Sequence, residues 1–271
     1  MELAPHDIIA TTTAVGGEVA HTAREGGIHV ALAAERLGTF IGIPITNTLV
    51  TSWVVMVVLI GLAFFVRRSL SVRPGNLQLV FEELITAVHT FIRDTLESDS
   101  QARRFLPLLL TLFLFIFVSN ALEFLPGIGS LGFYRGEEFV PLLRSVNTDL
   151  NVTLALTVIA VVVIEVSGVM ALGFFKYTSK FLNFSSPVNF FVGFVELVSE
   201  VARLVSFSFR LFGNIFAGEV LIGVVSYFVP YILPSGLMAF ELFVGFVQAA
   251  IFTLLTLFFI KLATTDVEHA H

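Results

Sequence analysis

The sequence predicts an all-α integral membrane protein. We expect about five membrane-crossing helices and one amphipathic helix on the membrane surface, with the last two crossing helices long, tilted and antiparallel. Hydrophobic residues make up 56% of the 271 positions and charged residues only 13%, whereas a soluble domain carries roughly 25% charge. The apolar residues gather in runs long enough to cross a hydrocarbon core, which needs about 20 consecutive residues.

Composition also excludes several kinds of protein. The formal net charge is −6 and no segment forms a basic face, so no nucleic-acid partner is expected. The chain has no cysteine, which excludes disulfides and cysteine-ligated metals. No pair among the six histidines has metal-ligand spacing, and no glycine-rich phosphate loop occurs. We therefore expect no metal, no cofactor and no nucleotide site.

The chain divides into an arm and a membrane domain. Residues 1–47 are predicted to be an extramembrane arm. They lack the basic segment and compact apolar run of a signal peptide. Residues 48–271 form a single membrane domain. Its first span is predicted at about 49–66 and ends at Arg67 and Arg68.

The next segment is predicted to be a helix at about 77–98 that lies on the membrane surface. Its apolar residues recur at helical spacing among charged ones, which is typical of an interfacial helix. This apolar face consists of Val80, Leu84, Val88, Phe91 and Leu96.

Two further spans are predicted at about 105–125 and 150–175. The loop between them contains glycine, proline and charges of both signs. Lys176 and Lys180 follow the second of these spans.

The last two spans are the unusual part of the predicted architecture. Ser186 is a good helix cap and Pro187 a good first-turn residue. A single helix over 187–228 would measure roughly 63 Å, about twice the thickness of the hydrocarbon core. It must therefore either break at a glycine or tilt by about 60° from the membrane normal. After a turn at Pro230, a last span is predicted at about 237–263.

Orientation follows from the distribution of lysine and arginine. Cytoplasmic loops are enriched in these residues, and six arginines lie between the first two spans: Arg67, Arg68, Arg73, Arg93, Arg103 and Arg104. With five crossings, this places the N-terminus outside and the C-terminus in the cytoplasm. The expected location is a bacterial inner or plasma membrane, crossed several times.

A polar stripe runs along the predicted helix 187–228. On a helical wheel at 100° per residue, its members lie within about 40° of a common line. Arg210 is the most informative of them, because a guanidinium stays charged and costs about 2.5–3.5 kcal/mol or more at bilayer depth. No acidic residue lies within one turn of it on the same helix, which indicates an intermolecular or long-range partner. The stripe consists of Glu196, Glu200, Arg203, Arg210 and Asn214.

Two interpretations of these residues remain open. In the first, Glu196 and Ser199 line an aqueous route from the cytoplasm, with Arg210 as a fixed positive barrier beyond them. Another route from the outside would be lined by Glu219, which lies about 140° from Glu196 on the wheel, together with Glu241 and Gln248 of the last span. In the second interpretation, such residues are internal salt bridges that hold the helices together. In that case Glu196 and Glu200 pair with Arg203, at spacings of seven and three residues.

Other polar residues also fit either a proton route or a structural role. Glu165, in the middle of its span, either joins a proton route or is protonated or bonded to a neighbouring helix. Asn120, Glu123 and Arg144 form either a structural polar cluster or the mouth of the outer route.

Several motifs together resemble subunit a of F-type ATP synthases, the stator that faces the rotating c-ring. They occur in the family's order and cover most of the chain beyond the arm. These motifs are Ile45-Thr46-Asn47-Thr48, Asn120-Ala-Leu-Glu-Phe-Leu-Pro126, Thr148-Asp149-Leu-Asn151, Leu211-Phe-Gly-Asn-Ile-Phe-Ala-Gly-Glu219 and Gln248-Ala-Ala-Ile-Phe252.

The resemblance implies roles for individual residues. Arg210 matches the essential stator arginine and Asn214 its polar companion, while Glu196 matches the cytoplasmic half-channel. The outer half-channel is matched by Glu219, Glu241 and Gln248, with Glu123 and Arg144 near its entrance. Glu200 and Arg203 depart from the family pattern.

The resemblance predicts a proton-translocating stator subunit with two offset half-channels. The expected partners are the c-ring, the peripheral-stalk subunit b, other synthase subunits and the lipid bilayer. ATP chemistry would then take place on other subunits, so this chain would not itself be an enzyme. The alternative is a secondary ion-coupled transporter that uses the same charges, although the internal repeat usual in such proteins is missing.

Overall fold

The computed structural model describes residues 34–40, 42–69, 75–124, 131–135, 138–181, 186–229 and 231–265. Most of the predicted arm and the C-terminal histidines lie outside these ranges. The elements are mainly helices, as the composition predicts. The helices are α2 (Asn47–Ser69), α3 (Asn76–Leu96), α4 (Asp99–Glu123), α5 (Leu150–Leu172), α6 (Phe174–Ser179), α7 (Pro187–Phe228) and α8 (Ile232–Thr264).

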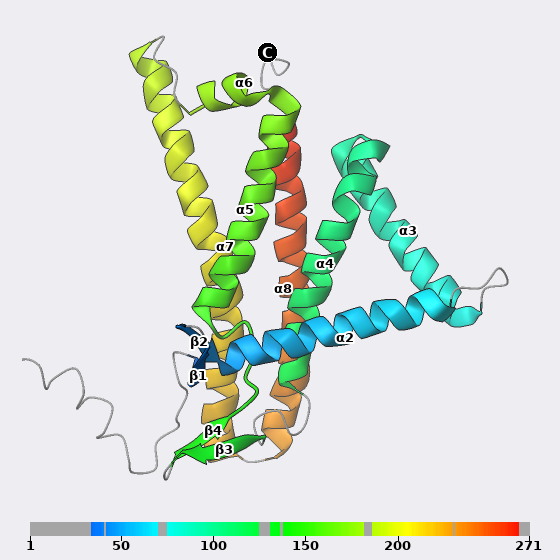
Figure 1. Cartoon of the computed structure of the whole chain (residues 1–271), viewed down its shortest axis with the longest axis vertical. Helices are drawn as coiled ribbons and strands as arrows, with labels where there is room; N and C mark the ends of the chain where they lie inside the picture. Colours follow the sequence, from blue (N-terminus) through cyan, green and yellow to red (C-terminus); the bar gives the residue numbers. More distant parts are fainter. Residues whose placement is uncertain are drawn as a thin grey trace, which may run out of the picture.

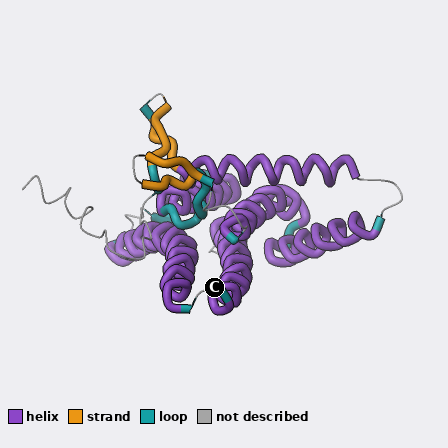
Figure 2. Tube along the Cα trace, turned by 90° about the horizontal axis from the view of Figure 1, so that it is seen from below, coloured by secondary structure: helices purple, strands orange, loops and turns teal. Residues whose placement is uncertain are grey.

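Five of these helices are long and apolar enough to cross a membrane: α2, α4, α5, α7 and α8. This confirms the predicted fold class. In Figure 1, α4, α5, α7 and α8 run side by side along the longest axis of the molecule, and α2 extends across them. Figure 2 looks roughly along the four helices and shows α2 lying across one side of the group. The long direction of α2 therefore differs from that of the four-helix group.

Helix α7 is one unbroken helix of 42 residues. Its start is as predicted, because the Ser186 hydroxyl accepts a hydrogen bond from the Val188 amide and Pro187 occupies the first turn. Neither Gly213 nor Gly218 interrupts it. Of the two options that the sequence left open, a break or a tilt, the structure excludes the break.

Other helix boundaries differ from the prediction for local reasons. Helix α4 begins at Asp99, earlier than the predicted 105, because the Ser98 side chain caps it. Helix α5 ends at Leu172, before the predicted 175, since Gly173 has a φ of +84° that a helix cannot continue. Helix α8 starts at Ile232 rather than 237, because Pro234 falls in its first turn, where no amide donor is needed.

Two small β-hairpins accompany the helices and were not predicted. Strands β1 (Arg36–Phe40) and β2 (Ile43–Thr46) pair antiparallel just before α2. Strands β3 (Gly132–Arg135) and β4 (Glu138–Pro141) pair antiparallel in the segment between α4 and α5. Both hairpins lie at the ends of helices, so they leave the helical core unchanged.

The core lies where α8 packs against α4, α5 and α7. Phe207 of α7 meets Phe252 and Phe259 of α8 edge-on, with ring centres 5.1 and 5.7 Å apart. Leu112 and Ile116 of α4 complete this cluster from the other side of α8. The contacts fix α7 and α8 as an antiparallel pair.

A buried group of polar side chains, here called the polar anchor, joins three helices to the segment before α5. The Thr48 hydroxyl donates to Asp149 (2.8 Å), the residue that caps α5. Asn147 donates to Asn120 (2.6 Å), which in turn donates to the Gly245 carbonyl of α8 (3.1 Å). These motif residues therefore hold the segment that carries Arg144. The polar anchor consists of Thr48, Asn120, Asn147 and Asp149.

The predicted surface helix corresponds to α3, over 76–96 instead of 77–98. Its apolar face divides into two parts. Ile92 and Leu96 are buried against α4 and α8, and Val88 packs against them. Val80 and Leu84 are exposed, with 66% and 56% of their surface accessible. The exposed half agrees with the interfacial position, which remains a prediction.

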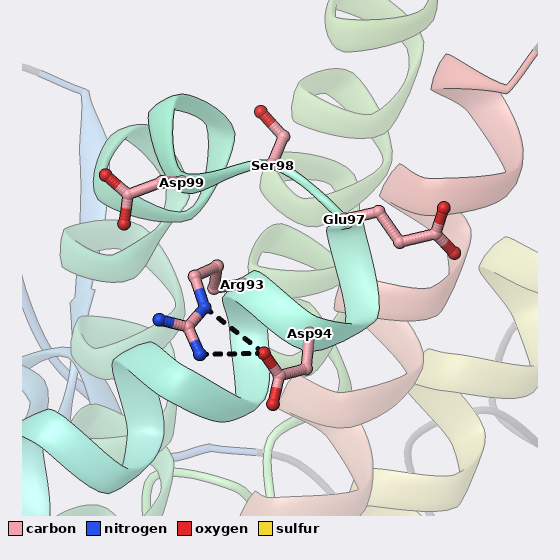
Figure 3. Close-up of a pocket in the computed structure, with 5 residues that line it drawn as sticks. All are labelled: Arg93, Asp94, Glu97, Ser98 and Asp99. Atoms are coloured by element: carbon pink, nitrogen blue, oxygen red, sulfur yellow. Dashed lines mark hydrogen bonds and ion pairs between the residues drawn. The ribbon is translucent and has the colours of Figure 1, made fainter.

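The turn between α3 and α4 carries part of the predicted cytoplasmic charge (Figure 3). Arg93 donates to the Asp94 carboxylate at 3.0 and 3.2 Å, and both lie beside Glu97 and the start of α4. Lys261 of α8 contacts Glu97 at 2.6 Å and holds the pKa of that exposed carboxyl below its usual value. This contact ties the end of α8 to the turn.

Candidate functional site

Arg210 lies near the middle of α7 with its side chain exposed. Its Nη2 donates to the Ser206 hydroxyl at 3.4 Å. Among the residues that the structure describes, no carboxylate is ion-paired with Arg210. A guanidinium without an acidic partner on its own chain repels cations and is available to an anionic group on another molecule.

A groove of about 390 Å³ extends along α7 beside Arg210. Its wall continues toward the start of the helix through Ser206, Arg203 and Ser199, and α8 supplies Leu255 and Phe259. The groove therefore joins Arg210 to the predicted cytoplasmic end of the stripe.

Asn214 lies one turn beyond Arg210 and faces α8. Its amide contacts the Gln248 carbonyl oxygen at 3.5 Å. Gln248 is buried, and its own amide nitrogen has no hydrogen-bond partner. This contact joins α7 and α8 through polar side chains, whereas the wheel grouped Gln248 with Glu219.

Glu219 meets a residue that the helical wheel did not predict. Its carboxylate lies 3.7 Å from the guanidinium of Arg144, which is buried and comes from the segment before α5. The Arg144 amide donates to the Thr51 hydroxyl of α2 (3.0 Å), so α2 helps to place the ion pair. Glu123 lies within electrostatic range of Arg144 and Glu219, and its Oε2 is buried without a hydrogen-bond partner.

Glu241 lies directly against α7 at Gly218. A Cβ atom at Gly218 would overlap the Glu241 carboxylate, so the absence of a side chain makes room for it. The wheel placed Glu219, Glu241 and Gln248 together. In the structure they make three separate contacts along the α7–α8 interface, with Arg144, Gly218 and Asn214.

The cytoplasmic end of the stripe is built from ion pairs. Glu196 contacts Lys180 at 2.5 Å, and the Ser199 hydroxyl donates to the Val195 carbonyl. Glu200 pairs with Arg203 at 2.7 Å. The guanidinium of Arg203 also lies 3.8 Å from the centre of the Phe259 ring of α8. Of the two interpretations left open for Glu200 and Arg203, this contact corresponds to the internal salt bridge.

Glu165 accepts a hydrogen bond from the Tyr177 hydroxyl of α6 at 3.0 Å. Of the alternatives left open, this contact corresponds to bonding with a neighbouring element.

Sequence reasoning missed two residues that contact the site. Lys180 and Tyr177 both follow α5, and Lys180 was used only to count positive charges in loops. A short helix after Gly173 turns this segment back toward α7, and no periodicity in the sequence indicates that turn. Among the described residues, no group of three or more His, Asp or Glu side chains could hold a metal ion.

Comparisons with known proteins support the resemblance noted above. The family model described as ATP synthase A chain matches residues 49–261. A protein of Mycobacterium tuberculosis named ATP synthase subunit a is 34% identical over 255 residues, covering 89% of this chain and 96% of that protein. Proteins of the same name from Campylobacter jejuni and Moorella thermoacetica are 34% and 30% identical, each over 80% of this chain and 89% and 90% of those proteins.

Proposed function

The chain belongs to the ATP synthase A chain family, and from this membership we propose that it is the proton-translocating stator subunit of the membrane sector. As a member of the family, it is a membrane protein that works within an ATP synthase together with other subunits. The proposal concerns what its intramembrane charges do there. ATP chemistry lies on other subunits, and this chain provides the path for protons.

The observation that carries the proposal is the exposed Arg210, which has no carboxylate partner among the residues that the structure describes. A carboxylate on a moving partner would be stabilised in its ionised form beside this guanidinium. It would become neutral again where a proton is available on either side. A ring of small helical subunits, the c-ring, is the proposed partner.

Two separate routes to Arg210 follow from the positions along α7. Glu196 and Glu219 are roughly 34 Å apart on the unbroken helix, with Arg210 between them. Glu196 and Ser199 belong to the proposed cytoplasmic route. The outer route would use the residues near the other end: Glu123, Arg144, Glu219, Glu241 and Gln248. A continuous pore would dissipate the membrane potential, so the positive charge of Arg210 must interrupt it.

The energy that each proton carries explains why a rotor is needed. One charge crossing about 100 mV yields only about 2.3 kcal/mol, so several protons must pass for each ATP. In the proposed orientation the N-terminus is outside and the C-terminus is in the cytoplasm of a bacterial cell. Subunit b of the peripheral stalk is the proposed neighbour that holds the stator in place.

Cysteine labelling tests the two routes, and the chain contains no cysteine that would interfere. In Glu196→Cys, we expect a small polar thiol reagent to react from the cytoplasmic side. In Glu219→Cys, Glu241→Cys and Gln248→Cys, it should react from the outside. Ile116→Cys is the control, because Ile116 is fully buried in the apolar core and should react from neither side. Equal labelling of all four route positions from one side of sealed membranes would disprove two routes.

Gly218 offers a second test, directed at Glu241. In Gly218→Ala the new methyl group should displace the Glu241 carboxylate, the flexible end of a side chain, at little cost in folding. A displaced carboxylate should slow proton conduction roughly tenfold, since misplacement by about 1 Å has large kinetic effects. Gly213→Ala is the matched control, because nothing lies within 4 Å of its Cβ position. The measurement is proton conduction by membranes with equal amounts of the chain, and equal rates in the two variants would refute a role for the Glu241 position.

A further inference from the structure

A second group of ionisable side chains lies inside the helix bundle, close to the cytoplasmic end of the stripe. Tyr177 donates to Glu165 of α5 at 3.0 Å, and Glu200 of α7 pairs with Arg203 at 2.7 Å. Helices α5 and α7 pack against each other, and Glu165 of α5 lies within electrostatic range of Glu200 of α7. We refer to Glu165 and Glu200 as the carboxyl pair.

The carboxyl pair is largely withdrawn from the surface. The side chains of Glu200 and Arg203 are only 13% and 16% exposed. Tyr177 is buried, and its ring fills the space that a side chain at Gly168 would occupy. The Oε1 atom of Glu165 is buried and has no hydrogen-bond partner among the described residues. This carboxyl oxygen can therefore form a further hydrogen bond inside the protein.

Few cations of the described part of the chain lie near the carboxyl pair. Besides Glu165 itself, the charged groups that act on Glu200 are Arg203 and, more weakly, Lys180, which is itself paired with Glu196. Helices α4 and α8 face this region with apolar side chains, which form one cluster with Tyr177: Phe105, Leu109, Leu257 and Ile260. From α8, the ring of Phe259 covers Arg203.

The charges near the pair favour one shared proton. Two adjacent carboxylates in an apolar region repel each other, so one of them retains a proton unless enough positive charge is close. Here the nearest cation is a single guanidinium, that of Arg203. The Tyr177 hydroxyl does not compete as an acid, because burial and the neighbouring Glu165 raise its pKa. It stays a hydrogen-bond donor.

The position of Arg203 connects the carboxyl pair with Arg210. Arg203 is bonded to Glu200 and also lines the groove that reaches Ser206 and Arg210. Glu196, by contrast, is engaged by Lys180 at 2.5 Å. A proton on the carboxyl pair is thus adjacent to the groove.

We propose that Glu165 and Glu200 share one exchangeable proton and form the last proton-binding position of the cytoplasmic route before the groove to Arg210. A proton from the cytoplasm binds to the pair, and the pair releases a proton into the groove toward the carboxylate of the rotor. Arg203 stays in place and balances the charge that remains. This inference rests on the proposed function.

Glu165→Gln tests the proposal without breaking the ion pair of Glu200. The glutamine retains the size of the side chain and an oxygen that accepts from Tyr177, but it does not titrate. The assay is ATP-driven proton pumping by inside-out vesicles that contain the assembled synthase, because their cytoplasmic face is open to the buffer. We expect the initial rate to fall roughly tenfold and its dependence on buffer pH to shift. The dependence on the pH inside the vesicles should stay unchanged.

Asp94→Asn is the matched control, since it removes an exposed carboxylate on the same side and should leave the pH profile as in the wild type. A Glu165→Gln enzyme with the wild-type rate and pH profile would overturn the proposal.

Glu200 needs a double variant, because Glu200→Gln leaves Arg203 without its ion pair. If the carboxyl pair carries protons, Glu200→Gln combined with Arg203→Gln should pump as poorly as Glu200→Gln alone. Recovery of pumping in the double variant would show that Glu200 only neutralises Arg203, and the proposal would be wrong.

Arg210→Ala tests the proposed stator function separately from the carboxyl pair. ATP-driven proton pumping that persists in Arg210→Ala would refute the stator function itself. Pumping that is lost in Arg210→Ala but unaltered in Glu165→Gln would refute the carboxyl pair alone.

Discussion

Arg210→Ala should reduce proton-driven ATP synthesis at least about 100-fold, which is the scale on which removing one electrostatic contact from a reaction site acts. In the proposed function, the Arg210 guanidinium holds a rotor carboxylate ionised between the two routes, and this variant loses that charge. Because the side chain is exposed and, among the described residues, its hydrogen bond is to Ser206, the helix bundle should still assemble. The measurement is ATP synthesis by energised membranes, with the amount of assembled complex determined in parallel.

Two further variants sharpen the Arg210 experiment. Arg210→Lys retains the charge but loses the planar five-donor group, so it should remain severely impaired. Arg103→Ala is the control, since Arg103 is an exposed arginine whose salt bridge with Asp99 lies on the first turn of α4. Near-normal synthesis by Arg210→Ala membranes with a normal amount of complex would disprove the proposed role.

Arg144→Met should destabilise the chain most among the variants discussed here. Arg144 is only 9% exposed, and its removal leaves the Glu219 carboxylate without a cation in a half-buried site. Breaking a buried ion pair costs about 3–5 kcal/mol, and the 30% exposure of Glu219 points to the lower end of that range. Methionine replaces the apolar stem of the arginine, so that the loss reflects charge and not packing. The measurement is resistance of the chain to denaturant in detergent.

The double variant separates stability from conduction at this ion pair. Arg144→Met combined with Glu219→Gln removes both charges and should recover most of the lost stability. It should not recover proton conduction, because the outer route loses a titratable group. If Arg144→Met alone is as stable as the wild type, the ion pair has no structural role.

Much of the fold could be predicted because hydrophobicity and proline positions determine it locally. No proline lies between Pro187 and Pro230, which favoured a continuous α7 while a break at a glycine stayed open, and Ser186 with Pro187 predicted its start. The misplaced boundaries depended on single residues such as Ser98 and Gly173, whose effect lies in backbone geometry. The hairpins are only four or five residues per strand, too short for periodicity to reveal.

The site could be predicted less completely, since a helical wheel gives directions but not neighbours. Arg210 stood out because a charge in an apolar run is costly wherever its neighbours lie. The partner of Glu219 is Arg144, which precedes it by 75 positions and is placed by the polar anchor. The contact between Glu165 and Tyr177 likewise depends on the turn at Gly173. Neither contact follows from spacing along one helix.

The length of α7 has a mechanical consequence. A helix of about 63 Å fits a core of about 30 Å only when tilted by about 60°, whereas the 23-residue α2 has the length to stand nearly upright. At that tilt, the roughly 34 Å between Glu196 and Glu219 correspond to about 17 Å in depth but roughly 29 Å sideways. Under the proposed function, a rotor carboxylate that takes up a proton beside one of these residues would have to move sideways around the rotor axis before it releases the proton beside the other. The slope of a single helix would then convert a proton current into torque.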